Sequence, residues 1–122
     1  MDIPLFDQNR VPRPKEEIRI EDVTITPYPD RFRVHVEINV TPFQERPNLV
    51  LVAHDENDRI VSELNIIQTM HTKMEFTLHL RNVDHPEGLY SLTMELFYDT
   101  KNPPQDRRIV AFTIPDDIDN NE

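Results

Sequence analysis

The chain has 122 residues and a net charge of −10 when its histidines are neutral, and a single domain is expected at this length. Its only glycine is Gly88 and it has no cysteine, which excludes glycine-rich phosphate loops, dinucleotide-binding fingerprints, disulfides and cysteine-based zinc sites. The excess of acidic residues argues against nucleic acid or an anionic membrane as the main partner.

Both ends of the chain are predicted to lie outside the folded domain, which we place at residues 16–115. Residues 1–15 predict an extended arm, because Pro4, Pro12 and Pro14 are poorly tolerated in helices and in sheet interiors. Residues 116–122 predict an acidic tail exposed to solvent. The arm also carries three apolar residues that could cover a surface of the domain: Ile3, Leu5 and Phe6.

The first two predicted strands differ in regularity. Residues 18–25 contain apolar side chains whose alternation changes phase near residues 21–22, so we expect a bulge there. Residues 31–41 alternate without interruption between apolar and polar side chains, and this period of two predicts a strand with one buried and one wet face. The side chains predicted to be buried are Phe32, Val34, Val36, Ile38 and Val40.

The next two segments are less regular. Residues 49–53 are apolar on both faces, and the polar run at residues 55–58 predicts a turn that returns the chain as a hairpin. Residues 59–66 fit either a strand or a helix, because Ile60 and Leu64 also follow a helical spacing. We favour the strand, since β-branched residues are frequent there and the flanking segments are strands.

Three further strands complete the pattern. Residues 73–81 and 90–98 alternate between apolar and polar side chains, and residues 108–114 are apolar on both faces. Seven strands separated by polar or proline-bearing connections predict an all-β fold, a seven-stranded antiparallel β-sandwich.

A short motif at residues 84–92 adds a family resemblance. Asp84, Gly88 and Tyr90 stand where an acidic residue, a turn glycine and a tyrosine open strand F of immunoglobulin-like domains. In those domains the tyrosine hydroxyl bonds back to the chain. The chain therefore resembles the disulfide-free immunoglobulin-like sandwiches, of which fibronectin type III domains are one kind. This resemblance implies a fold and a strand order, and it transfers no function.

Candidate chemistry is sparse in the sequence. His35 and Glu37 share one face of the second strand and His79 lies on a strand expected beside it, so these three are candidate metal ligands. Exposed histidines with cross-strand neighbours are the more common situation, and we expect no cofactor. The turn at residues 55–58 lacks the glycine and the distal Glu of an EF-hand, so a calcium loop is disfavoured. The chain's two serines have no His or acid at a catalytic spacing, and we expect no enzyme activity.

The immunoglobulin-like order implies two sheets with different outer faces. The first strand, the second strand and residues 73–81 would form one sheet, whose outer face is polar. Residues 49–53, 90–98 and 108–114 would form the other, in which two of the three strands are apolar on both sides. Its outer face would present either Val50 and Val52 or Leu49 and Leu51, together with Thr93, Phe97, Ile109 and Ala111.

An apolar outer face of this kind is expected to be covered, because each exposed aliphatic side chain forgoes about 1.5–3 kcal/mol of burial. Three covers are possible: a second copy of the chain, the N-terminal arm, or a different protein. We favour the second copy and predict a homodimer. Pairing through an edge strand is a further route to association, since Arg107 and Arg108 guard only one end of the last strand.

Two hypotheses about function follow. The first is a non-catalytic protein-interaction or self-association module that uses the apolar outer face. The alternative is a small-ligand or metal-binding domain centred on His35, Glu37 and His79. No apolar run is long enough to span a membrane, and the first residues lack the apolar stretch of a signal peptide. We therefore expect a cytoplasmic location.

Overall fold

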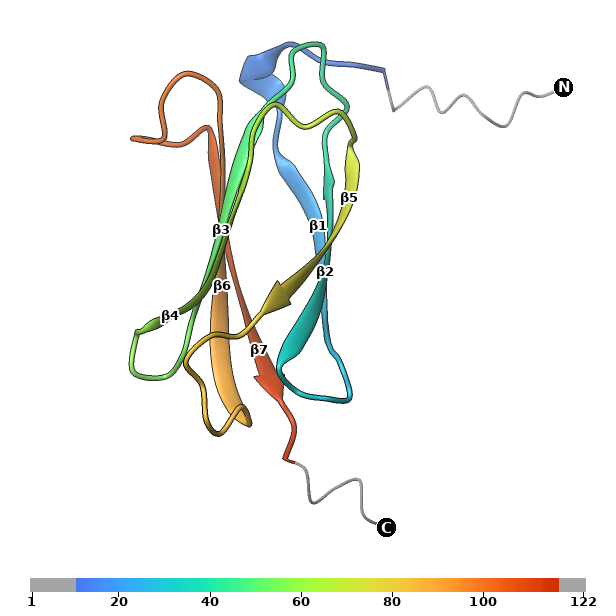
Figure 1. Ribbon diagram of the computed structural model, residues 1–122. Coiled ribbons are helices and arrows are strands. Elements are labelled where there is room, and N and C mark those ends of the chain that lie inside the picture. Colours follow the sequence, from blue (N-terminus) through green and yellow to red (C-terminus); the bar gives the residue numbers. More distant parts are fainter. Residues whose placement is uncertain (1–10, 117–122) are drawn as a thin grey trace, which may run out of the picture.

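Seven strands form two antiparallel sheets in residues 11–116, the part of the chain that the computed structural model describes (Figure 1). A short 3-10 turn, η2 (Lys15–Glu17), precedes them. The strands are β1 (Ile20–Pro27), β2 (Arg33–Val40), β3 (Asn48–His54), β4 (Ile60–Ile66), β5 (Lys73–His79), β6 (Gly88–Phe97) and β7 (Asp106–Ile114).

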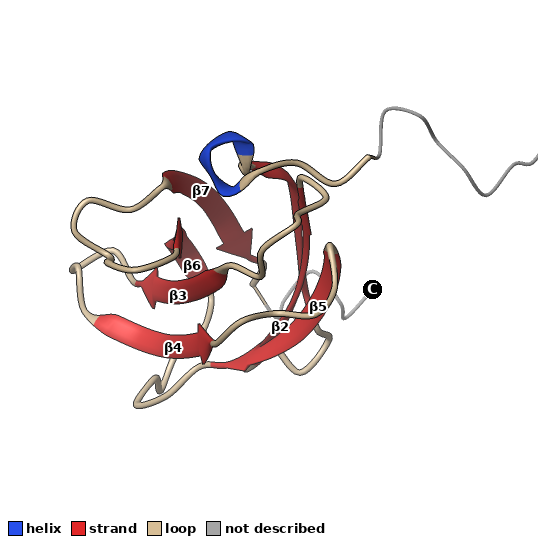
Figure 2. Cartoon of the chain, turned by 90° about the horizontal axis from the view of Figure 1, so that it is seen from above, coloured by secondary structure: helices blue, strands red, loops and turns tan. Residues whose placement is uncertain are grey.

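The two sheets lie face to face as a sandwich (Figures 1 and 2). One has the order β1-β2-β5 and the other the order β4-β3-β6-β7, which confirms the division of strands expected from the sequence. Residues 60–66, which also fit a helical spacing, form a strand that pairs with β3. Within residues 11–116, no helix is long and apolar enough to cross a membrane.

The core lies between the sheets and is built from every second residue of the strands. On β2, the four aliphatic side chains from Val34 to Val40 are fully buried, as the alternation predicts. β1 contributes residues on both sides of a register shift between Ile20 and Asp22. The predicted bulge is therefore confirmed, and it allows Ile18 and Ile25 to reach the same core although their positions differ in phase.

The turn between β1 and β2 departs from the predicted pattern. The carboxylate of Asp30 accepts hydrogen bonds from the backbone N–H of Phe32 at 2.9 Å and from Nε of Arg33 at 2.8 Å. Arg31 adopts a φ of 67°, so the extended backbone begins only after this turn. Phe32 precedes β2 and is 40% exposed. Its predicted place among the buried strand residues is wrong, because the turn interrupts the alternation.

The loop before β6 is held by the tyrosine that the sequence motif singles out. The buried Tyr90 hydroxyl donates a hydrogen bond to the carbonyl oxygen of Pro86 at 2.7 Å, which confirms the predicted bond back to the chain. The Tyr90 ring stacks on Phe112 with 5.4 Å between ring centroids. Gly88 has a φ of 138°, a conformation that side chains other than glycine rarely adopt. The corner therefore joins β6 to β7 and to the preceding loop.

The turn between β3 and β4 is organised by one carboxylate. Oδ1 of Asp55 accepts hydrogen bonds from the backbone N–H groups of Asn57 and Arg59, both at 2.9 Å. Oδ2 accepts a bond from the Arg59 guanidinium at 3.1 Å. The backbone N–H of Arg59, helped by that of Asn57 and by the Arg59 charge, holds the pKa of Asp55 below its ordinary value of 3.8.

Replacing Tyr90 by Phe tests the corner. The change leaves the ring packed but removes the hydroxyl that satisfies a buried carbonyl, so we expect a loss of about 1–2 kcal/mol in the free energy of unfolding. Tyr28→Phe is the matched control, because the Tyr28 hydroxyl bonds to Thr77 Oγ1 on an exposed surface and should contribute less than about 0.5 kcal/mol. Urea unfolding of both variants measures the difference, and equal losses would contradict the role given to Tyr90.

Replacing Asp55 by Asn tests the turn through its pH dependence. Because the folded pKa is lowered, the carboxylate contributes stability that is present above the unfolded pKa and is lost as pH falls through the folded one. Between about pH 5 and pH 2, wild type should therefore lose more stability than Asp55→Asn. Thermal unfolding across this range measures both, and Asp84→Asn at the same end of the molecule is the control. Parallel pH profiles of wild type and Asp55→Asn would show that the turn carboxylate makes no such contribution.

Candidate functional site

The outer side of the four-stranded sheet carries a set of apolar residues that we call the apolar outer face. Side chains opposite one another in a ladder share a face of the sheet. One row runs across three strands, from Val52 on β3 through Thr93 on β6 to Ile109 on β7. Alternation along each strand places the other members on the same side. The apolar outer face consists of Val50, Val52, Leu89, Thr93, Phe97, Ile109 and Ala111.

The structure decides which pair of β3 residues points outward. Leu49 and Leu51 are fully buried in the core, where they lie opposite Leu96 and Met94 of β6. Their alternative assignment to the outer face is therefore wrong. Both faces of β3 are apolar, so alternation alone leaves the choice open. Only the pairing with β6, whose apolar and polar sides differ clearly, fixes which residues face the core.

Exposure is uneven across the apolar outer face. Val50 points outward yet is only 4% exposed, because it lies on a central strand between the side chains of Asn65 and Glu95. Val52 and Phe97 are half-buried. Ile109, in contrast, is 53% exposed. Ile60 on β4, which lies opposite His54, is 58% exposed. Water-exposed apolar surface therefore lies toward both edges of the sheet, on β7 and β6 at one side and on β4 at the other, and less on the central β3.

One member of the apolar outer face is absent from the sequence prediction. Leu89 on β6 lies opposite Thr113 of β7 and is 50% exposed. The sequence correctly predicts that the next residue, Tyr90, points inward. If the alternation is continued one residue toward Gly88, Leu89 falls on the outer side. The predicted strand starts at residue 90, whereas β6 begins at Gly88, and this difference in the strand boundary hides the residue.

Few charged groups lie on this face. Arg107 and Glu95, opposite one another on β7 and β6, form an ion pair at 3.2 Å. Glu63 on β4 lies opposite Val52 and is exposed. For a chain with a net charge of −10, this sheet therefore presents a nearly neutral outer surface.

The outer side of the three-stranded sheet is polar, unlike the apolar outer face of the four-stranded sheet. Among the outward residues of β1, β2 and β5, all of them within the described part of the chain, none is apolar. They are Asp22, Thr24, Thr26, Arg33, His35, Glu37, Asn39, Lys73, Glu75, Thr77 and His79. The predicted contrast is present in part, because the outward side of the four-stranded sheet combines its apolar residues with polar ones, among them Asn48, His54, Asn65, Ser91 and Thr113.

The candidate metal ligands on this polar side do not converge. His35 Nε2 lies 3.3 Å from Glu75 Oε1, and Glu37 forms an ion pair with Lys73 at 3.3 Å. His79 is exposed and lies opposite Arg33 in the ladder. In residues 11–116, no group of three or more His, Cys, Asp or Glu side chains is arranged to hold a metal ion. The metal-binding alternative therefore gains no geometric support.

The predicted arm is described only in part. Ile3, Leu5 and Phe6 lie outside the described residues. Of the remainder, Arg13 forms a parallel bridge with Phe43. Its backbone N–H bonds to the carbonyl oxygen of Pro42 at 2.9 Å, and its carbonyl accepts a bond from Gln44 at 3.0 Å. This part of the arm lies against the β2–β3 loop, away from the apolar outer face.

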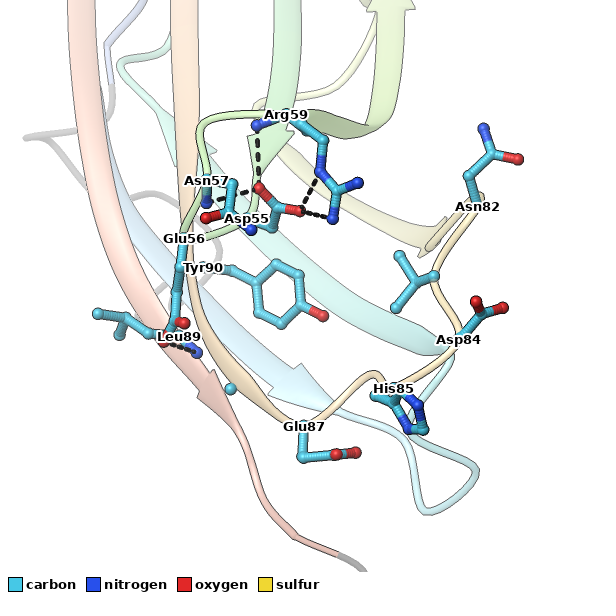
Figure 3. Close-up of a pocket in the computed structure, with 12 residues that line it drawn as sticks. Asp55, Glu56, Asn57, Arg59, Asn82, Asp84, His85, Glu87, Leu89 and Tyr90 are labelled. Atoms are coloured by element: carbon cyan, nitrogen blue, oxygen red, sulfur yellow. Dashed lines mark hydrogen bonds and ion pairs between the residues drawn. The ribbon is translucent and has the colours of Figure 1, made fainter.

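A shallow hollow of about 270 Å³ opens at the lower end of the sandwich, between the β3–β4 turn and the β5–β6 loop (Figure 3). Figure 3 shows the Tyr90 ring between these two segments, with Asp55 and Arg59 on one side and His85 on the other. Both Asp55 oxygens accept hydrogen bonds within the turn. Glu56 accepts a bond from the backbone N–H of Leu89 at 3.3 Å. The turn interpretation of residues 55–58 therefore accounts for these carboxylates without a calcium ion.

No protein-family model matches the chain, and no curated protein does. Solved structures share its fold at low sequence identity. A β-glucuronidase from Bifidobacterium dentium superposes with a TM-score of 0.62 at 15% identity over 81% of this chain. A glycosyl hydrolase family 2 member from Bacteroides cellulosilyticus gives 0.56 at 16% identity over 80%, and a β-glucuronidase from Ruminococcus gnavus gives 0.54 at 17% over 80%.

These similarities cover only a small part of the other chains: 18% of the Bifidobacterium enzyme, 14% of the Bacteroides enzyme and 16% of the Ruminococcus enzyme. At such identity the likeness shows the fold alone. The chain is therefore similar to a small β-sandwich portion of much longer glycosidases, and the activity of those enzymes does not come with it.

Proposed function

We propose that this chain is a non-catalytic module that associates with a second copy of itself through the apolar outer face of its four-stranded sheet. The observation that carries the proposal is the difference between the two sheets. Every outward residue of β1, β2 and β5 is polar, whereas the other sheet presents the exposed Ile109 and Leu89 beside further apolar side chains. A sandwich that needed only its internal core would have no use for this second apolar surface.

Energetics and charge favour a second copy as the partner. Ile109 and Leu89 are about half exposed, so completing the burial of each side chain stabilises an association by about 1 kcal/mol. Two copies with a net charge of −10 each repel one another in general. On the apolar outer face, however, Glu95 is paired with Arg107, so two such faces can approach with little local repulsion.

The four groups with displaced pKa values are not suited to acid–base catalysis. General acids and bases work best with a pKa near the operating pH. Among the described residues, Asp30 and Asp55 have lowered pKa values because backbone N–H groups and arginines stabilise their charged forms. Burial raises the pKa of Tyr90, and it raises that of Tyr98 to about 12. Each of these shifts moves away from neutral pH, so none of these four groups is tuned for acid–base catalysis.

The structural comparisons support an accessory role for the sandwich. The chain matches a minor portion of each glycosidase chain, which is the relation expected of a non-catalytic domain. The finer resemblance to immunoglobulin-like domains rests on the Tyr90 bond to Pro86 together with the strand order of the two sheets.

Ile109→Glu tests the proposal. Wild type should be dimeric by light scattering, and the variant should dissociate with a Kd at least about 10-fold higher, since about 1.4 kcal/mol corresponds to a factor of ten. Thr24→Glu is the matched control: it introduces the same side chain at an exposed position on the polar sheet and should leave the dimer intact.

Two results would overturn the proposal. The first is a wild-type chain that remains monomeric at about 0.1 mM, a concentration far above the micromolar Kd of a modest interface. The second is equal weakening by Ile109→Glu and Thr24→Glu, which would point to general charge repulsion rather than to a contact at this face.

A further inference from the structure

β7 is an edge strand with an unusual distribution of charge. It spans nine residues and pairs with β6 only. From Ile109 to Thr113 it carries no charge, and its outward residues there are exposed. Natural sheets ordinarily protect such an edge with lysines, prolines, bulges or a covering segment. The uncharged half of β7 has none of these within the strand.

The other sheet edges are protected. β1 has a bulge between Ile20 and Asp22 and ends at Pro27. β4 is engaged at its start, because the backbone N–H of Arg81 donates a hydrogen bond to the Val61 carbonyl at 2.8 Å. This bond links the β4 edge to the chain that follows β5, and β5 itself begins with the exposed Lys73. Strand addition is therefore disfavoured at each of these edges.

β1 covers only the beginning of β7. The backbone N–H of Ile20 donates a hydrogen bond to Asp106 Oδ2 at 2.8 Å, and the Arg108 guanidinium donates to the Ile20 carbonyl. Asp106 and Arg108 thus tie the first residues of β7 to the other sheet. Beyond them, β7 has no ladder partner besides β6 among the described residues, and an open hollow of about 550 Å³ lies between the β1–β2 turn and the end of β7.

We infer that β7 of one copy pairs antiparallel with β7 of a second copy, joining the two four-stranded sheets edge to edge. This arrangement rests on the self-association proposed above, and it places the contact at the β7 edge of the apolar outer face, where Ile109 lies, rather than across the whole face. Ile109 and Ala111 of the two copies then lie side by side across the junction, where each Ile109 loses part of its exposure. The outer faces of both copies lie on the same side of the joined sheet.

Charge selects the antiparallel orientation. Arg107 lies at the start of β7, and Asp116 follows its end. An antiparallel pair brings each Arg107 toward the partner's Asp116 and keeps the two Arg107 side chains apart. A parallel pair would place like charges opposite one another, which destabilises a sheet. Because residues 109–113 are uncharged, no repulsion arises along the length of the junction.

Single cysteines test this arrangement, and the chain has none of its own. Ile109→Cys, Ala111→Cys and Thr113→Cys place a thiol along the proposed junction at exposed positions. Each variant is oxidised alone and in an equimolar mixture with the next one, because an antiparallel pair places a residue opposite itself in some registers and opposite the residue two positions away in others. Thr93→Cys is the matched control on β6. With neighbouring strands about 4.8 Å apart, its partner thiol lies about three strand spacings away, beyond the roughly 7 Å between Cα atoms that a disulfide tolerates.

After mild oxidation, at least one β7 variant or mixture should form about 10-fold more covalent dimer than Thr93→Cys on a non-reducing gel, as the distance limit for disulfides implies. Efficient cross-linking of Thr93→Cys would instead indicate face-to-face packing and overturn the edge arrangement while leaving self-association standing. No cross-linking by any variant of a chain that light scattering shows to be dimeric would also overturn it. A monomeric wild type would remove the proposed function itself.

Discussion

The alternation of side chains along an extended strand is the constraint on which this structure depends. Each strand presents two faces, and the sandwich buries one face of every strand in a single shared layer. Alternate residues of β2 and β6 are fully buried and form the centre of that layer. They are Val34, Val36, Ile38 and Val40 on β2, and Leu92, Met94 and Leu96 on β6. Each sheet buries only its inner side in this core. The core therefore does not determine which residues stand on the outer sides of the sheets.

Specific contacts at the corners then close the sandwich. Tyr90 anchors the loop before β6 through its bond to Pro86, and Asp55 organises the neighbouring turn. On one lateral side, Asp106 and Arg108 tie β7 to Ile20 of β1. On the other, Arg81 bonds to Val61 of β4. Within residues 11–116, the uncharged half of β7 is one stretch of sheet edge that these contacts leave open.

The proposed association follows from the same division of faces. On the polar outer side of β1, β2 and β5, charged side chains form ion pairs with one another, as Glu37 does with Lys73. The other sheet gathers exposed apolar area around Ile109 and Leu89, next to the open edge of β7. A contact near this edge covers apolar side chains and pairs backbone groups at the same place, two contributions that reinforce each other.

The fold class, six of the seven strands and the polar outer side of one sheet follow from the amino-acid pattern alone. These are local properties, since a period of two is visible in any strand with one polar face, and prolines mark the connections. The resemblance of residues 84–92 to the corner of immunoglobulin-like domains also implied the local bond from the Tyr90 hydroxyl to the chain.

The remaining features depend on contacts between segments that are distant in the sequence. The β3 segment is apolar on both faces, so the burial of Leu49 and the outward position of Val50 depend on pairing with β6. The Asp30 turn, whose hydrogen bonds are invisible in the alternation, removes Phe32 from the strand. The exposure of Ile109 against the burial of Val50 reflects which strand is central and which is at the edge. Neighbours across a sheet come from distant parts of the chain, and a periodic pattern carries no information about them.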